Sequence, residues 1–268
     1  MTLDVLICCI DKGMVRIADA LAQARNDVHY IMSYQYTDER YLDLIPAELK
    51  SRSDVTLYTY KGKGLSANRN LALEKATAEL VMYLDDDTRL TDNAFETIFH
   101  TMEKNPEIDV AFFCASTYTG KPLKNYPQEE CVITTMPKDY TISAIEMVAR
   151  RTSIQGCVRF DERFGLGTPF LTCGEEDIWM VDATKANLKM HYFPTKIVET
   201  STLLKKAMIY VDAGVQRSYG AISYYKYGRK AWLKCFQFAT NAAKSKMAHF
   251  WPLMRHMSEG IRFMQKTS

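Results

Sequence analysis

The sequence has no closely spaced cysteine pair. Its seven cysteines are scattered and odd in number, so neither a disulfide framework nor a cysteine-bound zinc site is expected. The five histidines also lack the H-E-x-x-H spacing of zinc proteases. These absences exclude the usual small secreted and zinc-dependent classes.

Long apolar runs are also absent. The opening run, residues 3–10, follows no basic segment and is too short for a signal peptide or a membrane span. Internal repeats and low-complexity segments are lacking as well. A chain of 268 residues with 47% hydrophobic content has room for one large α/β domain or two small ones. We therefore expect a globular, cytoplasmic protein.

Charge is distributed unevenly along the chain. Residues 226–268 carry nine Lys or Arg but only one acid, Glu259, whereas the rest of the chain is acidic. The tryptophan and phenylalanine residues interleaved with this charge are Trp232, Phe236, Phe238, Phe250, Trp251 and Phe263. This combination predicts either peripheral attachment to an anionic membrane, on the inner face of the cytoplasmic membrane, or a helical pair that packs its aromatic side chains. Nucleic-acid binding is not expected, because no recognition motif accompanies the basic segment.

The hydrophobic pattern alternates between strand-like and helix-like segments. Strands are expected at residues 5–10, 29–34, 55–60, 80–85, 110–114 and 189–198, the last of them interrupted by Pro194. Helices are expected at residues 14–24, 66–78, about 92–104 with Thr91 or Asp92 as the cap, 175–186, and most of the chain after 201. Residues 120–139 predict a loop-rich insertion. Repeated strand–helix units imply a mainly parallel sheet.

Three consecutive acids, Asp85, Asp86 and Asp87, follow the apolar run that ends at Leu84. Adjacent carboxylates at the end of a buried strand repel one another and need compensation. Asp85 and Asp87 can point the same way from an extended segment and offer hard oxygen ligands suited to Mg²⁺ or Mn²⁺. The alternative is a solvated acidic turn before the next helix.

A basic, glycine-bearing loop covers residues 61–70, between a strand and a helix. Lys61, Lys63 and Arg69 supply positive charge, and the helix start offers free N–H groups, so the loop is suited to a diphosphate. The spacings G-x-x-x-x-G-K-[ST] and G-x-G-x-x-G are absent, which argues against a Walker loop and a dinucleotide fingerprint. The alternative is a flexible basic loop before a capped helix.

A third acidic group, Glu175, Glu176 and Asp177, follows Gly174 at the start of an expected helix. Such acids are ordinary partners of the helix dipole. Taken with the other two elements, they suit chemistry in which a nucleotide leaves a bound sugar while an acid removes a proton from an incoming hydroxyl.

In this order, the motifs resemble the family 2 glycosyltransferases of GT-A fold. The matching segments are residues 5–10, 64–72, 84–87, 160–165 and 176–177. The resemblance spans about residues 3–202 and implies an α/β fold: a GT-A-type single Rossmann-like domain with a mainly parallel central sheet, plus C-terminal helices. We accordingly expect a catalytic domain at 1–202 and a helical, basic-aromatic extension at 203–268.

The resemblance also implies roles for individual residues. Asp177 would be the general base, and Asp85 and Asp87 the metal-binding DxD acids, with Mn²⁺ or Mg²⁺ as the cofactor. The residues expected to bind the nucleotide-sugar are Cys9, Asp11, Gln35, Gly64, Arg69, Asn70, Asp85 and Asp86.

Two departures from the family pattern affect these roles. Many relatives place a metal-binding histidine after a late strand, where this chain has Glu199; either Glu199 or water would then complete the metal site. An acidic Asp-Asp-Gly-Ser turn commonly ends the second strand, whereas this chain reads Ser33 to Asp38 there. Recognition of the nucleobase or ribose is therefore expected to differ.

The function expected from these features is the inverting transfer of a hexosyl or hexosaminyl group from a nucleotide-sugar to a hydroxyl group, with a UDP-sugar as the leading donor. The expected acceptor is a saccharide or a lipid-linked molecule, and the expected role is the assembly of surface polysaccharide or glycolipid. The alternatives are a nucleotidyltransferase of similar fold and a non-catalytic nucleotide-sugar-binding protein. An aspartyl phosphatase is disfavoured, because Arg89 stands where such enzymes need Thr or Val.

Overall fold

A computed structural model of the chain describes residues 1–135, 140–201 and 206–267. The chain divides into two compact units. The first contains Met1–Lys63, Ala67–Arg159 and Asp182–Leu204, and the second contains Gly64–Ser66, Phe160–Val181 and Lys205–Ser268. The expected boundary between residues 202 and 203 lies outside the described residues, so the division into domains at that point stays a prediction.

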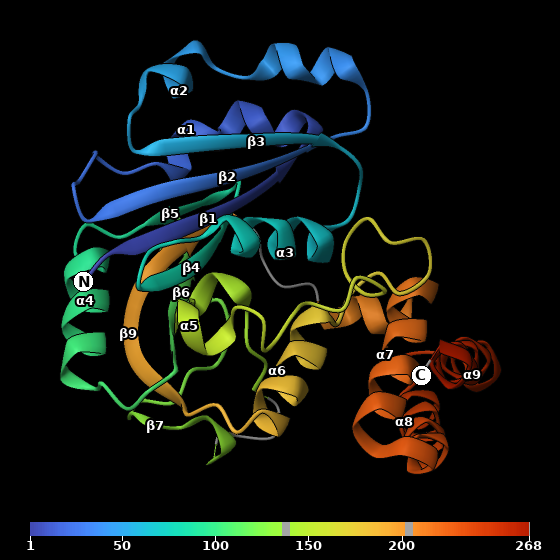
Figure 1. The fold of residues 1–268 in the computed structure, drawn as a ribbon. Coiled ribbons are helices and arrows are strands. Elements are labelled where there is room, and N and C mark those ends of the chain that lie inside the picture. Colours follow the sequence, from blue (N-terminus) through green and yellow to red (C-terminus); the bar gives the residue numbers. More distant parts are fainter. Residues whose placement is uncertain (136–139, 202–205, 268) are drawn as a thin grey trace. The chain divides into compact units, whose positions relative to one another are not determined.

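One curled sheet forms the centre of the first unit (Figure 1). Its order is β3-β2-β1-β4-β8-β6-β9-β5, with β7 paired to β9. The strands are β1 Leu3–Ile10, β2 Val28–Tyr36, β3 Val55–Lys61, β4 Leu80–Asp85, β5 Thr88–Leu90, β6 Val110–Thr117, β7 Cys131–Val132, β8 Met147–Arg150 and β9 Met190–Thr200. Neighbours among β1 to β4 run parallel, as do β6 and β9, whereas β5, β7 and β8 pair antiparallel. The expected α/β class with a mainly parallel sheet is confirmed.

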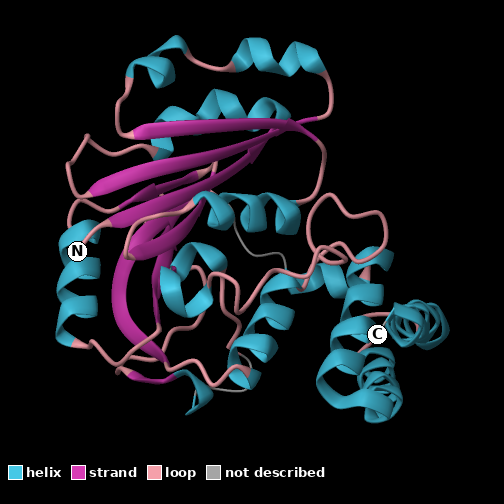
Figure 2. Ribbon diagram, in the orientation of Figure 1, coloured by secondary structure: helices cyan, strands magenta, loops and turns pink. Residues whose placement is uncertain are grey.

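Alternation along the strands gives the sheet two distinct faces. Leu3, Val5 and Ile7 of β1 lie in one core cluster, together with residues of α1 (Ile17–Ala20) and α4 (Ala94–Lys104). Leu6 and Cys8 point to the opposite face, because successive side chains of a strand alternate. Helix α3 (Leu65–Lys75) follows β3 and leads into the strand that carries the acidic turn. The remaining short helices of this unit are α2, Ala47–Ser51, and α5, Arg151–Ile154 (Figure 2).

The helix expected at residues 14–24 is wrong for most of its length. Residues Asp11–Arg16 form a 3₁₀ helix, and only Ile17–Ala20 are α-helical. Asp11 has a φ of +46°, and its carboxylate accepts hydrogen bonds from the Thr37 amide (2.7 Å) and hydroxyl (2.9 Å). This contact holds the chain after β1 to the chain after β2, and a local periodicity cannot anticipate it.

Two smaller expectations also need correction. Neither Thr91 nor Asp92 is the cap of α4, because Asn93 occupies that position and its side chain makes no capping hydrogen bond. Strand β9 is not interrupted at Pro194 and runs from Met190 to Thr200. The register of β9 against β6 shifts on either side of Cys114, so an irregularity in the ladder accommodates the proline.

The second unit is helical. Helix α6, Glu175–Lys185, begins in it, followed by α7 Ala213–Tyr227, α8 Ala231–Lys244 and α9 Phe250–Thr267. Helices α7 and α9 cross at two glycines: a Cβ on Gly220 would lie 2.0 Å from the Met257 carbonyl oxygen, and one on Gly260 would lie 1.9 Å from that of Arg217. The helices expected after residue 201 are thus confirmed within the described residues. No helix among those residues is long and apolar enough to cross a membrane.

Candidate active site

The three-aspartate turn follows the last residue of β4 and sends its first two side chains to different partners. Asp85 lies 3.5 Å from the guanidinium of Arg69 on α3, which is itself almost fully buried. Burial raises the pKa of the Asp85 carboxyl, Arg69 lowers it, and Asp87 raises it again. A buried arginine beside this carboxylate stabilises its ionised form, and the acid pair leaves negative charge that a cation would neutralise.

Asp86 points to the 3₁₀ segment after β1, where it pairs with Arg16 at 2.5 Å. Gly13 lies opposite this carboxylate: a Cβ there would lie 1.7 Å from an Asp86 oxygen, so any larger residue would displace the Asp86 side chain. Burial is also the main cause that raises the pKa of Asp86, with Arg16 opposing it. The acidic turn is therefore a packed element and not only a solvated cap.

Asp87, the last of the three acids, is held by hydrogen bonds from Ser201 and Tyr118. Its carboxylate accepts a hydrogen bond from the Ser201 hydroxyl at 2.6 Å, and its carbonyl accepts one from the Tyr118 hydroxyl at 2.9 Å.

Glu199 lies on β9, and two cations engage its carboxylate. Arg89 and Lys196 each approach it to 2.8 Å, and these hydrogen bonds lower the pKa of Glu199. Within the described part of the chain, no group of three or more His, Cys, Asp or Glu side chains is arranged to hold a metal ion. The structure thus places Glu199 in ion pairs, and its role as a third metal ligand stays a prediction.

A hydrogen-bonded network joins the ends of the first three strands to α3. The Asn68 side-chain amide donates to the Cys9 carbonyl at 3.2 Å, and the Tyr60 hydroxyl lies 3.2 Å from the Asn68 side-chain oxygen. Gln35 donates to the same hydroxyl at 2.6 Å. Two of the expected nucleotide-site residues, Cys9 and Gln35, are therefore brought together by Tyr60 and Asn68, which sequence analysis did not assign.

Cys9 and its neighbour Cys8 are both buried thiols. Burial raises the pKa of Cys8 to about 12 and raises that of Cys9 as well. Neither thiol is ionised near neutral pH, so neither is a nucleophile, and Cys9 contributes its backbone carbonyl to the network. Asn70 is likewise buried, one residue beyond Arg69 on α3.

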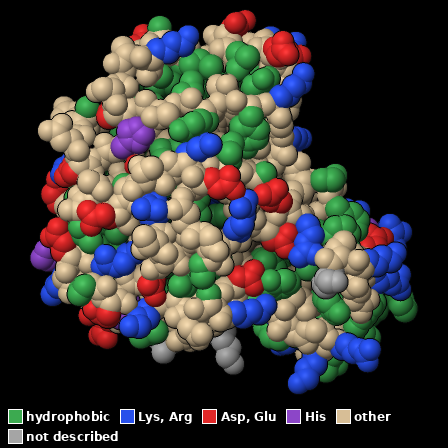
Figure 3. Space-filling model, in the orientation of Figure 1, with side chains coloured by type: hydrophobic (Ala, Val, Ile, Leu, Met, Phe, Trp, Pro, Cys, Tyr) green, Lys and Arg blue, Asp and Glu red, His purple; other side chains and the backbone are tan. Residues whose placement is uncertain are grey.

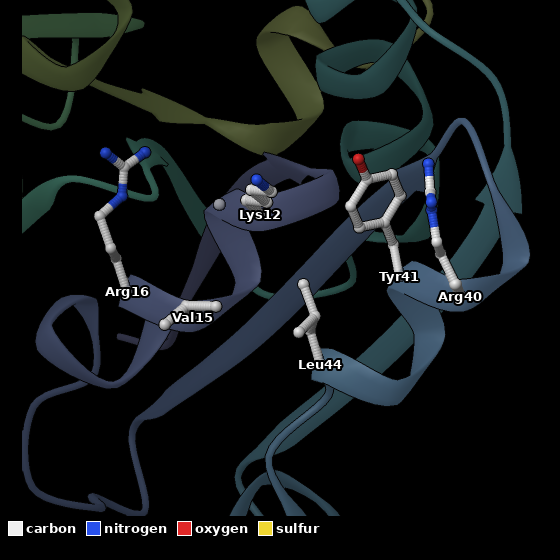
Figure 4. A pocket seen from close by; sticks show the side chains of 7 residues that line it. Lys12, Val15, Arg16, Arg40, Tyr41 and Leu44 are labelled. Carbon is white, nitrogen blue, oxygen red and sulfur yellow. The ribbon is translucent and has the colours of Figure 1, made fainter.

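A cavity of about 700 Å³ opens beside the acidic turn in the first unit (Figure 4). Its lining residues are Lys12, Gly13, Val15, Arg16, Arg40, Tyr41 and Leu44. The two walls are joined by the buried Tyr34 hydroxyl, which lies 2.7 Å from the Tyr41 carbonyl oxygen and 3.0 Å from that of Asp11, within hydrogen-bond reach of both. Since Arg16 also pairs with Asp86, the cavity adjoins the candidate metal site, and its cationic rim suits an anionic ligand.

In the second unit, a glycine-rich loop contacts the start of α3. The Ser66 hydroxyl donates to the Phe164 carbonyl at 2.7 Å, and the Leu65 amide donates to the Leu166 carbonyl at 2.9 Å. Gly165 between them has a φ of +108°, and a Cβ there would lie 3.0 Å from the Ser66 hydroxyl oxygen. Gly64, at the edge of this contact, has a φ of +141°, which favours glycine. The contact fixes the loop that precedes the third acidic group.

Asp177 lies in the first turn of α6, where the helix dipole favours negative charge. The side chains of Ile178 and Phe164 anchor this end of the helix in a core cluster with Ala221. The carboxylate of Asp177 is half-exposed and forms an ion pair with Lys226, in the last turn of α7. The structure thus places Asp177 at a helix start in an ion pair with Lys226, and its role as the general base stays a prediction.

The family model for glycosyl transferase family 2 matches residues 16–157, more than half of the chain. This chain is a member of glycosyl transferase family 2. The matched segment contains Arg69 and the three-aspartate turn, whereas Asp177 lies beyond it. None of the curated proteins matches the chain.

Solved structures that resemble this glycosyltransferase include three of S. aureus TarS, each 13% identical to it. TarS residues 1–349 have a TM-score of 0.60, with 91% of this chain and 72% of that chain covered. The same segment in complex with UDP-GlcNAc has a TM-score of 0.59, with 91% and 73% covered. A longer TarS structure has a TM-score of 0.58, with 90% of this chain and 43% of that chain covered. The GT-A fold expected from the sequence is thereby confirmed.

Proposed function

We propose that this glycosyltransferase is an inverting enzyme that moves a hexosyl or hexosaminyl group from a UDP-sugar to a hydroxyl acceptor, in the assembly of surface polysaccharide or glycolipid. The observation that carries the proposal is the family match over residues 16–157, which contains the Arg69–Asp85 pair and the acidic turn. Structures of TarS with UDP-GlcNAc and with UDP support a uridine nucleotide as the donor class.

The reaction assigned to this site needs one base and one stabilised leaving group. Asp177 takes the proton of the acceptor hydroxyl as that oxygen forms a bond to the anomeric carbon. The bond from this carbon to the donor phosphate breaks on the opposite face, and the electron pair leaves with the nucleoside diphosphate. Attack opposite the leaving group inverts the anomeric configuration, by analogy with inverting glycosidases.

Donor recognition is assigned to the first unit. The network of Cys9, Gln35, Tyr60 and Asn68 presents amide and hydroxyl groups beside the ends of the parallel strands, where α/β sheets bind ligands. Arg69 orders Asp85 from the buried side and Asn70 follows it on α3. Asp11 acts through the backbone, because its carboxylate is committed to Thr37. Gly64 keeps the loop before α3 free of side-chain bulk.

A divalent cation fits the donor set of the acidic turn. Asp85 and Asp87 supply hard oxygen ligands. The negative charge of Asp87 raises the pKa of Asp85, and a bound cation would offset this repulsion. These two residues would hold Mn²⁺ or Mg²⁺, and the cation would supply positive charge to offset the charge that develops on the leaving diphosphate. Glu199 fits less well, since Arg89 and Lys196 already engage it, so water and donor oxygens are the better candidates for the remaining positions.

Replacing Asp87 with Asn tests the metal assignment. The amide keeps an oxygen for the Ser201 hydroxyl but removes the charge, so the fold should persist while Mn²⁺ affinity falls by at least about 10- to 100-fold. Calorimetric titration with Mn²⁺ and turnover with added EDTA measure the effect. Asp92→Asn, an exposed acid beyond the turn, is the control. Full EDTA-resistant turnover in the wild type would contradict a metal-dependent mechanism.

Lys226 is assigned a positioning role, since its ion pair orients the Asp177 carboxylate without entering the reaction. Lys226→Met should lower kcat by roughly two- to fivefold, the range for a partly exposed ion pair, and leave the KM for the donor unchanged. Lys226→Arg should restore most of the loss, and Lys230→Met, on the following turn, should have no effect. A wild-type kcat in Lys226→Met would show that the pair has no positioning role.

We place the enzyme in the cytoplasm, at the surface of an anionic membrane that carries a lipid-linked or polysaccharide acceptor. All seven cysteines are free thiols, which agrees with a reducing compartment. The basic C-terminal helices support the membrane position.

Stabilisation by a true donor tests the proposed function. In the presence of Mn²⁺, only the nucleotide-sugars of the donor class that binds should stabilise the protein. At 100 times the Kd the free energy of unfolding should rise by about 2.7 kcal/mol, and the unfolding temperature should rise with it. UDP-sugars should give the largest shifts. Equal shifts for all nucleotides, or none, would count against a nucleotide-sugar site.

A further inference from the structure

The aromatic residues of the C-terminal segment divide into packed and exposed groups. Helices α8 and α9 share a core of small and apolar residues, against which Trp232, Phe238 and Phe250 are partly buried. Phe263 packs against Phe170, with ring centroids 5.0 Å apart. Helix packing, the alternative considered from the sequence, thus accounts for four of the six tryptophan and phenylalanine side chains.

The other two belong to an exposed apolar edge, which we define as Leu233, Phe236, Met247 and Trp251. Their exposed fractions are 61%, 52%, 53% and 79%. Leu233 and Phe236 are three residues apart on α8 and therefore share a side of that helix. Phe250 joins the two helices at this edge, because its ring lies 5.4 Å from that of Phe236 and 5.1 Å from that of Trp251.

Positive charge predominates around this apolar edge in sequence and along its helices. The exposed basic residues of the segment include Arg229, Lys230, Lys234, Lys244, Lys246 and Arg255. The single acid, Glu259, is paired with Arg217 at 2.9 Å and with Arg255 at 3.4 Å. Figure 3 shows Lys and Arg side chains gathered over the C-terminal helices. Apolar side chains flanked by unopposed cations match an anionic lipid surface, where phosphates lie next to hydrocarbon.

We propose that the apolar edge inserts shallowly into the interface of an anionic bilayer, while the flanking Lys and Arg side chains contact the lipid phosphates. A second copy of the chain is a poorer occupant, because two such edges would bring positive charges together. The inference rests on the proposed function only in that a membrane-bound acceptor explains why the enzyme binds a membrane. The binding itself requires neither a donor nor turnover. It assigns the contact to four side chains.

Tryptophan fluorescence tests this assignment. The sequence has three tryptophans, of which Trp179 is buried, Trp232 is partly buried under Arg262, and Trp251 is exposed. With vesicles of phosphatidylcholine containing about a third phosphatidylglycerol, at low salt, we expect co-sedimentation and a blue shift of the emission. Bromine-labelled acyl chains should quench the wild type but not Trp251→Phe, which should still bind. High salt should weaken binding, because exposed charges are screened.

Matched variants separate the insertion of apolar side chains into the bilayer from the electrostatic attraction of Lys and Arg to lipid phosphates. Trp251→Ser with Phe236→Ser should weaken vesicle binding at least about tenfold, whereas Val132→Ser, which is 49% exposed in the first unit, should not. Lys244→Glu should weaken it by about fivefold or more. Hydrolysis of the donor in solution should be unchanged in all of these variants, so a failed proposal for the base or metal would not affect this result. Failure of the wild type to sediment at low salt, or binding without any change in Trp251, would overturn the proposal.

Discussion

Turnover of Asp177→Asn should fall about 10²- to 10⁴-fold, the usual contribution of a positioned general base. The amide cannot take the proton of an acceptor hydroxyl, but it fits the same place in the first turn of α6. The residue is half-exposed, so losing its ion pair with Lys226 should cost little stability. Steady-state kinetics and calorimetry with a UDP-sugar would measure turnover and donor affinity separately, and only turnover should change.

Asp182→Asn, the same substitution later on α6, is the control for this prediction, because the Asp182 carboxylate lies 3.5 Å from the exposed Lys185 ammonium and has no assigned part in the reaction. Its turnover should equal that of the wild type. If Asp177→Asn lost donor affinity and kept near-normal turnover, Asp177 would belong to the donor site and another group would be the base.

The largest stability effect is expected at a buried ion pair in the first unit. Lys124 donates to the Glu146 carboxylate at 2.8 Å, to the Ser143 hydroxyl at 2.9 Å and to the Thr141 carbonyl at 2.6 Å. Glu146 is completely buried and also accepts a hydrogen bond from the Tyr126 hydroxyl. Lys124→Met would leave this charge uncompensated, so the free energy of unfolding should fall by about 3–5 kcal/mol.

The pH dependence of this loss has a definite sign. Burial raises the pKa of Glu146, and Lys124 is the first of the groups that lower it. Without the lysine, the carboxyl should protonate more readily, so the deficit should be largest at high pH and should shrink as pH falls. Denaturant unfolding across pH measures it. Lys121→Met, at an exposed lysine of the same segment, should be neutral, and Lys124→Met with Glu146→Gln should recover part of the loss. A deficit below about 1 kcal/mol in Lys124→Met would contradict the account.

Local patterns in the sequence are sufficient for the strands that carry the site. The run from Leu80 to Leu84 predicts β4 and the position of Asp85, because a strand buried on both faces needs a continuous apolar segment. The glycines before α3 and α6 likewise mark the two loops. The fold class therefore follows from short-range periodicity.

Long-range contacts determine what could not be predicted. The 3₁₀ segment after β1 depends on Asp11 holding Thr37 and on Gly13 meeting Asp86, and no periodicity encodes either contact. The Lys124–Glu146 pair joins residues 22 positions apart, and only Lys124 lies in the stretch predicted as loop-rich, residues 120–139. Glu199 looks available in the sequence, and its two cationic partners are evident only in the structure.

The exposed edge of the C-terminal helices illustrates the same limit. Composition identifies six tryptophan and phenylalanine residues in a basic segment, but the division between packed and exposed side chains depends on how α8 meets α9. Only the structure distinguishes Trp251, which is exposed, from Trp232, which is partly buried.

Phosphorus NMR of the products formed from a UDP-sugar tests the central claim most directly. With Mn²⁺ present and water or a saccharide as acceptor, we predict that UDP appears and that Asp177→Asn does not produce it at a comparable rate. Release of inorganic diphosphate would identify attack at phosphorus and a nucleotidyltransferase instead. Binding of nucleotide-sugars with no phosphorus product from any of them would contradict the account and indicate a non-catalytic binding protein.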